Sequence, residues 1–402
     1  MADAERALST LCRNAVDVIE KSDLKARLDE GKSLRIKAGF DPSAPDIHLG
    51  HTVLLRKLRE FQDLGHKVIL IIGDATARIG DPTGQSKTRP ILTADEVSAN
   101  AKTYKQQAFK ILDKAPKKIE VVHNSKWLDK PEMFKTLIGL CGLVTVDQLL
   151  VRDDFDKRRA AHKPIYLQEL LYPMMQGYDS VAVKADVELG GTDQLFNLLM
   201  GRQIQSLYKM QPQVVMTMPL LVGLDGVQKM SKSLGNHIGV TDPAKDVFGK
   251  TMSIPDALME SWYDLLTQKS GREVSARVAG GLLHPRDAKL ELGKELVARL
   301  YDKKTAEREA AEFDRVFSRR EEPADPKVHA LPAFDIDSAS LLKQVKAVGS
   351  TSQAYRLIRQ GAVTLDGQRL TDPKARPPLK DGSLLKVGKK LYFKIILKRC
   401  IS

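Results

Sequence analysis

The 402-residue chain is predicted to be an α/β protein with a mostly parallel sheet, followed by a helical domain and a small basic α+β module. Three observations predict this order. An alternation of strand and helix patterns fills the first half, charged amphipathic segments rich in leucine come next, and most of the net charge lies near the end. The predicted domains are residues 1–233, 234–325 and 337–402.

The first domain opens with a strand, a helix and a second strand. Residues Leu34–Phe40 are typical of a short strand, and His51–Leu64 places its leucines on one helical face before Gly65 ends the helix. The unbroken apolar run Val68–Ile72 fits a parallel strand that is buried on both faces. This order predicts a βαβ unit with a right-handed crossover.

The same alternation returns later in the first domain. We expect strands at Ser180–Leu189 and Val214–Met218, with a helix starting near Asp193 between them. Thr192 is a candidate cap for that helix. Two such halves predict a Rossmann-like sheet with helices on both faces, extending to about Ser233.

The rest of the chain changes character twice. Residues 234–320 carry leucines among many charges, as packed amphipathic helices do, and the prolines of residues 320–335 indicate a linker. In the tail, Ser350–Gln353 matches a capping box for a helix ending at Gly361. Asp366–Gly367 follows a predicted strand and is typical of a tight hairpin turn.

Composition excludes several classes of protein. No run of about 18 apolar residues is present, so we expect no membrane span, and the N-terminus lacks the apolar segment of a signal peptide. Cys12, Cys141 and Cys400 lie far apart and are odd in number, so neither a metal site nor a disulfide framework is expected. A reduced, cytoplasmic setting is the simplest interpretation.

Charge is distributed unevenly. The net charge is +13, and residues 335–402 hold 14 Lys and Arg against five Asp and Glu. A basic excess confined to one module indicates a polyanionic partner, although a solvated basic surface would also fit.

Two short motifs carry chemistry. His48–His51 (HLGH) lies between the first strand and its helix, where free backbone N–H groups and two imidazoles can meet a phosphate. Lys229–Ser233 (KMSKS) follows two glycines, and its lysines could neutralise the charge on departing pyrophosphate. Alone, HLGH would also fit a capped helix with two surface histidines, and KMSKS would also fit a solvated basic loop. Their occurrence together, in this order, on an α/β background is far more specific.

The pair of motifs resembles the two signature sequences of class I aminoacyl-tRNA synthetases, with Leu49 in place of the usual isoleucine. Four further stretches narrow the resemblance to bacterial-type tyrosyl-tRNA synthetases, over nearly all of the chain. These are Gly39–Pro42, Gly80–Gly84, Tyr172–Asp179 and Gly190–Gln194.

The resemblance implies a tyrosine–tRNA ligase that forms tyrosyl-adenylate from tyrosine and ATP and then charges tRNA(Tyr). It implies a tyrosine pocket made by Thr76, Asp81, Tyr172, Gln176, Asp179 and Gln194. It implies an ATP site made by Gly39, Asp41, His48, Gly50, His51, Gly191, Asp193 and Lys232. Catalytic contacts to the phosphates are implied for His48, His51, Lys229, Lys232 and Arg89. Magnesium is expected to arrive with ATP, and no resident metal site is expected.

In this resemblance Asp179 accepts a hydrogen bond from the substrate phenol. A site built to bind a hydroxyl rejects the analogue that lacks it, because a buried polar group is then left unpaired; tyrosyl-tRNA synthetases are themselves the established example. Two positions depart from many members of the family. Lys37 stands where they have a tyrosine that also contacts the phenol, as in a second bacterial subgroup, and Glu188 stands where they have glutamine.

The tail resembles an RNA-binding module of a ribosomal small-subunit protein. The resemblance implies contacts to RNA phosphates from Arg356, Arg359, Lys374, Arg376 and Lys380. The family is also homodimeric, and the apolar stretch Leu137–Leu150, with Leu140, Leu143, Val144, Leu149 and Leu150, is a candidate interface.

Two alternatives share part of this pattern. A tryptophanyl-tRNA synthetase or another nucleotidyltransferase could carry the first two motifs, but the residues around Asp179 and the basic tail favour tyrosine. An RNA-binding protein on a retired synthetase scaffold would have no need of intact His48, His51 and Lys229–Ser233.

Overall fold

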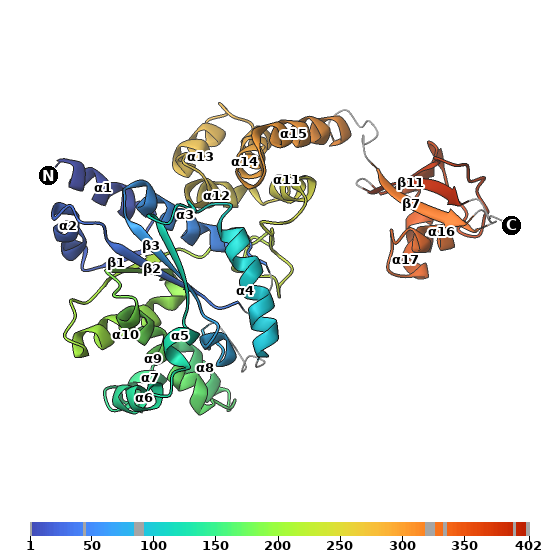
Figure 1. Ribbon diagram of the computed structural model, residues 1–402. Helices are drawn as coiled ribbons and strands as arrows, with labels where there is room; N and C mark the ends of the chain where they lie inside the picture. Colours follow the sequence, from blue (N-terminus) through green and yellow to red (C-terminus); the bar gives the residue numbers. More distant parts are fainter. Residues whose placement is uncertain are drawn as a thin grey trace. The chain divides into compact units, whose positions relative to one another are not determined.

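The computed structural model describes residues 2–42, 46–83, 92–317, 326–332, 336–388 and 391–398. They form two compact units, Met1–Glu309 and Ala310–Ser402 (Figure 1). The predicted α/β class, with a parallel sheet, a set of helices and a small α+β module, is confirmed. The predicted boundary at residue 233 falls inside the first unit.

The first unit is built on a six-stranded sheet in the order β1-β6-β5-β2-β3-β4. All neighbouring strands are parallel except β1, which pairs antiparallel with β6 at one edge. The strands are β1 Asp17–Ile19, β2 Arg35–Phe40, β3 Lys67–Ile72, β4 Ile119–His123, β5 Val187–Gly191 and β6 Val214–Met218. The chain builds outward from β2 to β4 and then returns to the other side of β2 with β5. Ligands of open α/β sheets bind at such a reversal, beyond the carboxyl ends of the strands.

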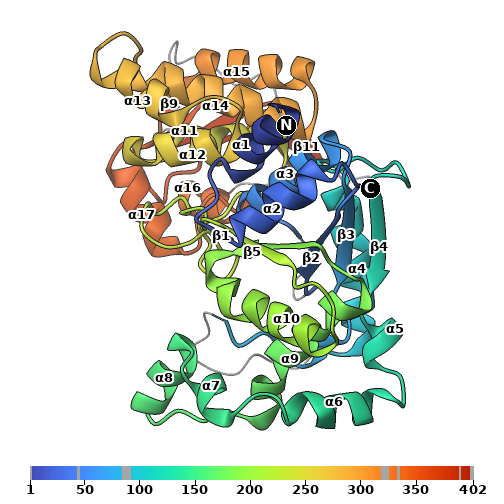
Figure 2. The same cartoon turned by 90° about the vertical axis from the view of Figure 1, so that its left-hand side faces the viewer.

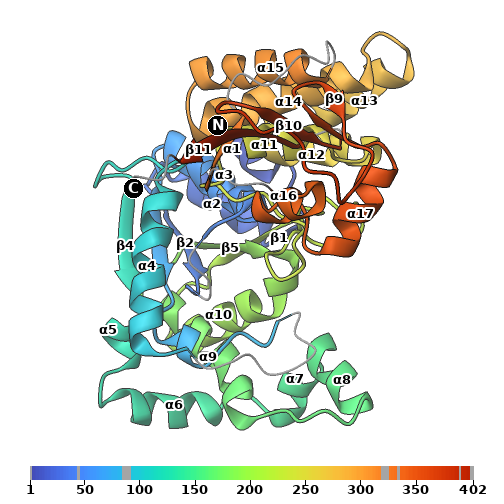
Figure 3. The same ribbon diagram turned by 90° about the vertical axis from the view of Figure 1, so that its right-hand side faces the viewer.

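Helices cover both faces of this sheet. α3 (Leu49–Asp63) packs on one face, against β3 and β5, while α10 (Leu195–Leu207) packs on the other, against β5 and β6 (Figure 2). α9 (Leu167–Ala182) lies against α10, and α4 (Ala94–Ala108) runs beside β4 (Figure 3). The other helices of this part are α1 Ala2–Cys12, α2 Lys21–Asp29, α5 Ser125–Leu128, α6 Met133–Cys141, α7 Val146–Leu150 and α8 Asp153–Ala160.

One predicted strand was half wrong. Residues 180–182 end α9 instead of starting a strand, and only Val187–Gly191 is extended. The helical stripe that begins at Leu170 and includes Met174 outweighs the brief alternation of two valines, and Lys184, with φ of +51°, ends the turn. The following helix begins at Leu195, after a 3₁₀ turn at Thr192–Gln194.

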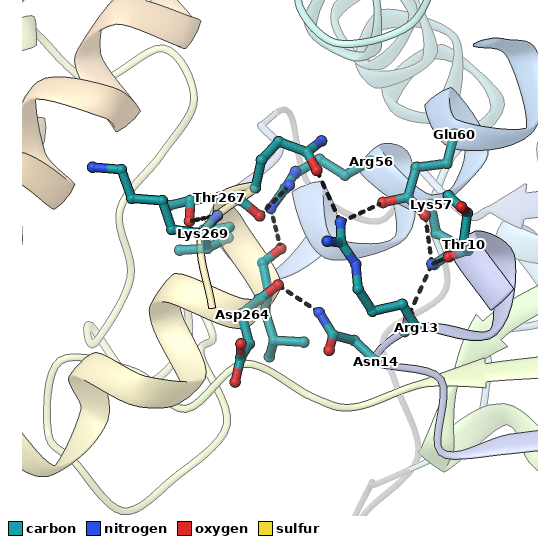
Figure 4. Close-up of polar contacts among 12 residues, drawn as sticks. Thr10, Arg13, Asn14, Arg56, Lys57, Glu60, Asp264, Thr267 and Lys269 are labelled. Carbon is teal, nitrogen blue, oxygen red and sulfur yellow. Dashed lines mark hydrogen bonds and ion pairs between the residues drawn. The ribbon is translucent and has the colours of Figure 1, made fainter. Parts of the chain in front are cut away.

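The helices that follow the sheet dock on α3 through buried polar groups. Arg56 of α3 donates to the carbonyls of Leu265 and Thr267 at 2.6 Å each, and so satisfies the end of α12 (Met259–Leu266) (Figure 4). Asn14 adds a bond to the Asp264 carbonyl at 2.6 Å. The remaining helices here are α11 Ala244–Met252, α13 Gly271–Ala279, α14 Pro285–Leu300 and α15 Lys303–Phe317. The predicted helical segment is therefore confirmed.

The second unit contains a five-stranded sheet in the order β7-β11-β10-β8-β9. Its strands are β7 Lys327–Pro332, β8 Val363–Leu365, β9 Gln368–Arg369, β10 Leu384–Val387 and β11 Leu391–Lys398. The predicted linker was wrong at β7, which pairs parallel with β11. Prolines did not prevent this, because β7 is an edge strand and its proline is the last residue.

The local signals of the tail were mostly right. α17 (Thr351–Arg359) is capped by Ser350, which accepts from the Gln353 N–H, and Gly361 follows it with φ of +66°. Asp366 and Gly367 both have positive φ and join β8 to β9 by a two-residue turn. α16 (Ser338–Gln344) completes the module. No helix among the residues described here is long and apolar enough to cross a membrane.

Candidate active site

The predicted site residues lie beyond the carboxyl ends of neighbouring parallel strands. Asp41 follows β2, Thr76 follows β3, and Asp193 follows β5, on either side of the point where the strand order reverses. The topology therefore brings together segments more than 100 residues apart, as it does in other open α/β sheets.

The HLGH motif forms the start of α3. His48 is the N-cap, and its Nδ1 accepts the Gly50 N–H at 3.1 Å, while Nδ1 of His51 accepts the His48 N–H at 3.3 Å. A Cβ on Gly50 would come within 2.9 Å of the His48 ring, so the glycine lets the ring fold over the helix end. The spacing of the motif is thus set by a reciprocal cap, as in a capping box.

Both imidazoles are neutral near pH 7. Burial lowers the pKa of His48 to about 2 and that of His51 to about 4. Because each Nδ1 accepts a backbone N–H, the ring proton must be on Nε2 in both residues. Two neutral Nε2–H donors and the first N–H groups of α3 can therefore bind an anion.

The lysines of the KMSKS motif are paired with carboxylates. Nζ of Lys229 lies 2.8 Å from Oδ2 of Asp193, and Nζ of Lys232 lies 2.5 Å from Oδ2 of Asp46. All four side chains are partly exposed, so these ion pairs are weak and exchangeable. Asp46 was not predicted from the sequence.

Backbone pairing holds the two motifs together. The Leu49 N–H donates to the Ile238 carbonyl at 2.9 Å, and the Val240 N–H donates to the Ile47 carbonyl at 2.9 Å. Asn236, which is 5% exposed, organises the lysine loop, because its Oδ1 accepts the Ser231 N–H at 2.8 Å. This support was missed in the sequence, although Asn236 lies only three residues beyond the motif.

One chain of hydrogen bonds joins the predicted tyrosine pocket to Asp41. The Tyr172 hydroxyl donates to Oδ2 of Asp41 at 2.8 Å, and the Thr76 hydroxyl donates to Oδ1 at 2.7 Å. Nδ2 of Asn124 then contacts Thr76 Oγ1 at 3.0 Å and Asp179 Oδ2 at 3.3 Å. Burial and the Asp41 charge raise the pKa of Tyr172 well above its usual value, so it stays a donor.

Asp179 is a buried carboxylate held by two donors. It is 3% exposed, and its Oδ1 accepts the Trp127 indole N–H at 2.7 Å. Burial raises the pKa of Asp179 to about 6, while Lys37 and the bonds from Trp127 and Asn124 act in the opposite direction. The group is therefore mostly ionised at neutral pH and can accept a further hydrogen bond.

A second hydrogen-bonded cluster contains three side-chain amides and the Asp81 carboxylate. Gln194 donates to Oδ2 of Asp81 at 2.8 Å, and Nδ2 of Asn197 bridges the side-chain oxygens of Gln176 at 3.1 Å and Gln194 at 2.9 Å. The structure thus connects Asp81, Gln176 and Gln194, all three predicted from the sequence. It adds Asn197, which was not predicted.

The remaining residues named from the sequence for this site are two glycines, Arg89 and Lys37. A Cβ on Gly39 would meet nothing within 4 Å, and one on Gly191 would meet Asp193 at 2.7 Å. Arg89 lies outside the described residues. Lys37 is fully buried and does not face the substrate pocket. Its Nζ is bonded within the chain, 2.8 Å from Oε1 of Glu188.

The predicted RNA-binding residues belong to the second unit. Arg356 and Arg359 are exposed on α17 and border a surface hollow with Tyr355, whose ring lies 5.9 Å from the Arg359 guanidinium carbon. The others, Lys374, Arg376 and Lys380, are exposed in the loop before β10.

Asn124 and Trp127 are the main site residues that the sequence did not indicate. They follow β4, a strand that was not predicted, at the same edge of the sheet as Asp41 and Thr76. Recognition of Ile119–His123 as a parallel strand would have pointed to them. Among the described residues, no three His, Cys, Asp or Glu side chains gather as a metal-ligand set.

Known proteins are similar to this chain over most of its length. The family described as tRNA synthetases class I (W and Y) matches residues 29–318, and the S4 domain matches residues 340–381. The tyrosine–tRNA ligase of Moorella thermoacetica is 49% identical over 98% of this chain and 96% of its own length. That of Coxiella burnetii is 48% identical over 98% of this chain and 99% of its own.

Solved structures agree on the fold. The crystal structure of a tyrosyl-tRNA synthetase from Archaeoglobus fulgidus, complexed with L-tyrosine, matches with a TM-score of 0.64 and 23% identity, over 77% of this chain and 100% of that one. A likeness at this identity concerns the fold alone. The family match and the full-length relatives together show that the chain belongs to the tyrosyl-tRNA synthetases, a family of class I aminoacyl-tRNA synthetases.

Proposed function

We propose that the site described above carries out both steps of tyrosine–tRNA ligation. In the first step the tyrosine carboxylate attacks the α-phosphate of ATP, so that a C–O–P bond forms and pyrophosphate leaves. In the second, the terminal ribose hydroxyl of tRNA(Tyr) attacks the adenylate carbonyl and AMP leaves. The protein supplies position and charge stabilisation, and no covalent enzyme intermediate is needed.

Asp179 is the proposed reader of the phenol. Its carboxylate accepts from Trp127 and Asn124 and has lone pairs left for the substrate O–H. The ammonium group of the substrate needs acceptor oxygens, and these are supplied by the side chains of Tyr172, Gln176, Asp81 and Gln194. Thr76 is held in the same site by its hydrogen bond to Asp41.

The proposed ATP site is the start of α3 with the lysine loop. The neutral Nε2–H groups of His48 and His51 donate to phosphate oxygens, and Lys229 and Lys232 exchange their present carboxylate partners for phosphate. Asp193, once released from Lys229, is free to accept from the ribose hydroxyls. Gly39, Asp41, Gly50 and Gly191 border the same edge of the sheet.

The observation that carries the proposal is the buried Asp179 with its two donors, at the sheet edge that also holds the two histidines. Amino-acid-dependent ATP–pyrophosphate exchange tests it directly, with all twenty amino acids offered to the full chain. Exchange with tyrosine alone is expected. Exchange with tryptophan alone would keep the reaction class and overturn the assignment of Asp179, and no exchange by folded protein would overturn the proposal.

Three further parts of the assignment rest on the same function. Mg²⁺ comes with ATP, held mainly by phosphate oxygens and water. The exposed arginines of α17 contact phosphates of tRNA(Tyr). The enzyme works in the cytoplasm, where charged tRNA is used.

We also infer a homodimer, with an interface that overlaps the predicted stretch Leu137–Leu150 and keeps Leu143 but not three of the other predicted side chains. Leu140, Val144 and Leu149 are buried in the chain's own core. The apolar side chains left exposed nearby are Phe134, Ile138, Leu143, Val146 and Val151. An exposed apolar group of this kind, on α6, α7 and the residues next to them, supports an interface with a second copy. Sedimentation of wild type against Phe134→Glu tests it.

A further inference from the structure

Two buried charges lie behind the helix that carries Asp179. Lys37 in β2 and Glu188 in β5 are 0% and 1% exposed, and they face each other directly as partners in the parallel ladder. Nζ of Lys37 lies 2.8 Å from Oε1 of Glu188. Removing two charges from water is costly, and a buried ion pair is often no more stabilising than apolar residues of the same volume. The pair therefore calls for a reason other than stability.

Lys37 is attached to α9 at two points. Its ammonium donates to the Gln176 carbonyl at 2.9 Å and to the Ser180 hydroxyl at 2.7 Å. An ammonium has three N–H groups, and the bond to Glu188 uses the third. Lys37 therefore has no donor left for a substrate, and any effect that it has on tyrosine must be indirect.

Glu188 closes the network from the other side. Its Oε2 accepts the Ser180 hydroxyl at 3.1 Å and is also bonded by the Gln213 side chain. Space for this cluster is left by Gly201 of α10, where a Cβ would come within 3.0 Å of Glu188 and closer still to Ser180 and Gln213. The cluster is thus fitted between the sheet and the two helices.

Asp179 lies between the two points at which Lys37 contacts α9. We propose that the Lys37–Glu188 pair is a positioning element for substrate recognition: it fixes the Gln176–Ser180 turn so that Asp179 meets the phenol, and it thereby sets the selectivity for tyrosine over phenylalanine. This inference rests on the phenol-reading role proposed above for Asp179.

The charges act in the same direction as the geometry. Five groups face Asp179. They are Lys37 in β2, Glu188 in β5, Trp127 and Asn124 in the segment after β4, and Tyr172 in the same helix. After burial, Lys37 has the largest effect on the pKa of Asp179, which it lowers, while Glu188 has a smaller, opposite effect. The pair as a whole therefore favours the carboxylate form, which is the stronger acceptor for a phenol O–H.

The test removes the pair without leaving one charge alone. Lys37→Met with Glu188→Gln deletes both charges, whereas Lys37→Met by itself would strand a buried carboxylate and could prevent folding. Tyrosine- and phenylalanine-dependent ATP–pyrophosphate exchange are measured on the full chain from pH 5.5 to 9. We expect the tyrosine KM to rise about tenfold or more with little change in kcat, and the tyrosine-to-phenylalanine ratio to fall by a similar factor. The acidic limb of kcat/KM for tyrosine should move to higher pH.

A matched control is a second buried ion pair, between Arg158 of α8 and Glu169 of α9. Arg158 and Glu169 are each 2% exposed and 2.6 Å apart, and Glu169 lies ten residues before Asp179, about 15 Å along the helix. Arg158→Met with Glu169→Gln should lower the melting temperature but leave the amino-acid ratio and the acidic limb in place. If it changes both as much as the first double variant does, the effect is one of general stability and the inference fails.

A single substitution gives a shift of the opposite sign. Glu188→Gln removes the charge that raises the pKa of Asp179 and keeps Lys37 bonded to the Gln176 carbonyl and the Ser180 hydroxyl. Because it leaves Lys37 without its carboxylate, this variant should melt at a lower temperature, so exchange is measured on protein that circular dichroism shows to be folded; there the acidic limb should move to lower pH. An unmoved limb in both Glu188→Gln and the double variant would overturn the inference. The proposed function fails separately, if wild type shows no tyrosine-dependent exchange or if Asp179→Asn leaves the amino-acid ratio unchanged.

Discussion

Trp127→Phe isolates the hydrogen bond that holds Asp179, the carboxylate proposed to accept the substrate phenol. The indole N–H lies 2.7 Å from Oδ1 of Asp179, and phenylalanine keeps an apolar ring but no donor. A hydrogen bond to a buried charged group contributes about 1.5–3 kcal/mol. Since 1.36 kcal/mol corresponds to one pKa unit, the loss should raise the pKa of Asp179 by about one to two units.

The sign of the effect on activity follows from that shift. Asp179 has a pKa of about 6 and is the stronger acceptor for the phenol O–H when it is ionised, so wild-type kcat/KM for tyrosine should fall as the pH drops through about 6. In Trp127→Phe the same fall should begin one to two units higher, by the estimate above. At pH 7 the variant should lose up to about tenfold in kcat/KM and should regain most of it at pH 9.

The assay is tyrosine-dependent pyrophosphate exchange across this pH range, with the chain's other tryptophan as the control. Trp262 is fully buried and donates its indole N–H to the Val222 carbonyl at 3.1 Å, away from Asp179. Trp262→Phe removes the same donor from an uncharged acceptor and should leave the acidic limb where it is. If Trp127→Phe also leaves the limb unmoved, the bond does not tune Asp179 and the reasoning is refuted.

Three other outcomes are expected. His48→Ala with His51→Ala should slow single-turnover adenylate formation by orders of magnitude while tyrosine still binds; an unchanged rate would exclude a role in phosphate binding. A chain that ends at residue 317 should keep pyrophosphate exchange and lose most tRNA charging, whereas full charging would exclude the second unit from tRNA binding. Arg56→Met should destabilise the fold by about 2–4 kcal/mol, read from denaturant unfolding, because two carbonyls at the end of α12 lose their donors; unchanged stability would contradict that capping role.

The structure changes the position at which the chain should be cut to remove the basic tail. The predicted basic module begins at residue 337, but β7 lies before that point and pairs with β11 along six residues. A cut at residue 337 would leave β7 on the enzyme as an unpaired edge strand, which is a site for aggregation. Ending the chain before β7 removes the second sheet as a whole.

Local signals predicted much of the fold, because they depend on residues close together in the sequence. The Val68–Ile72 run, the cap at Ser350 and the Asp366–Gly367 turn each specify one element through its own backbone preferences, and each was found. The end of α9 was not predicted, because two valines two residues apart fit a strand as well as the last turn of a helix. Packing against α10 decides between them.

Residues of the site were predictable where a short motif specifies them. His48, His51, Lys229 and Lys232 each lie in a run of a few residues whose spacing follows from a helix cap or a loop. The partners of Asp179 are different, because Asn124 comes from a strand more than 50 residues earlier in the chain. Only the sheet order brings that strand's end to the pocket.

Lys37 and Glu188, the two departures from the family pattern, could not be interpreted from the sequence either, because their contact depends on the sheet. Taken singly, Lys37 looks like a lost phenol contact and Glu188 like an unrelated exchange, since 151 positions separate them. In the sheet they are direct ladder partners, and their charges compensate within 2.8 Å. A buried lysine without the glutamate, or a buried glutamate without the lysine, would be strongly destabilising. In this chain the two residues therefore act as one unit, and its proposed effect on tyrosine passes through the turn of α9 to which both residues are bonded.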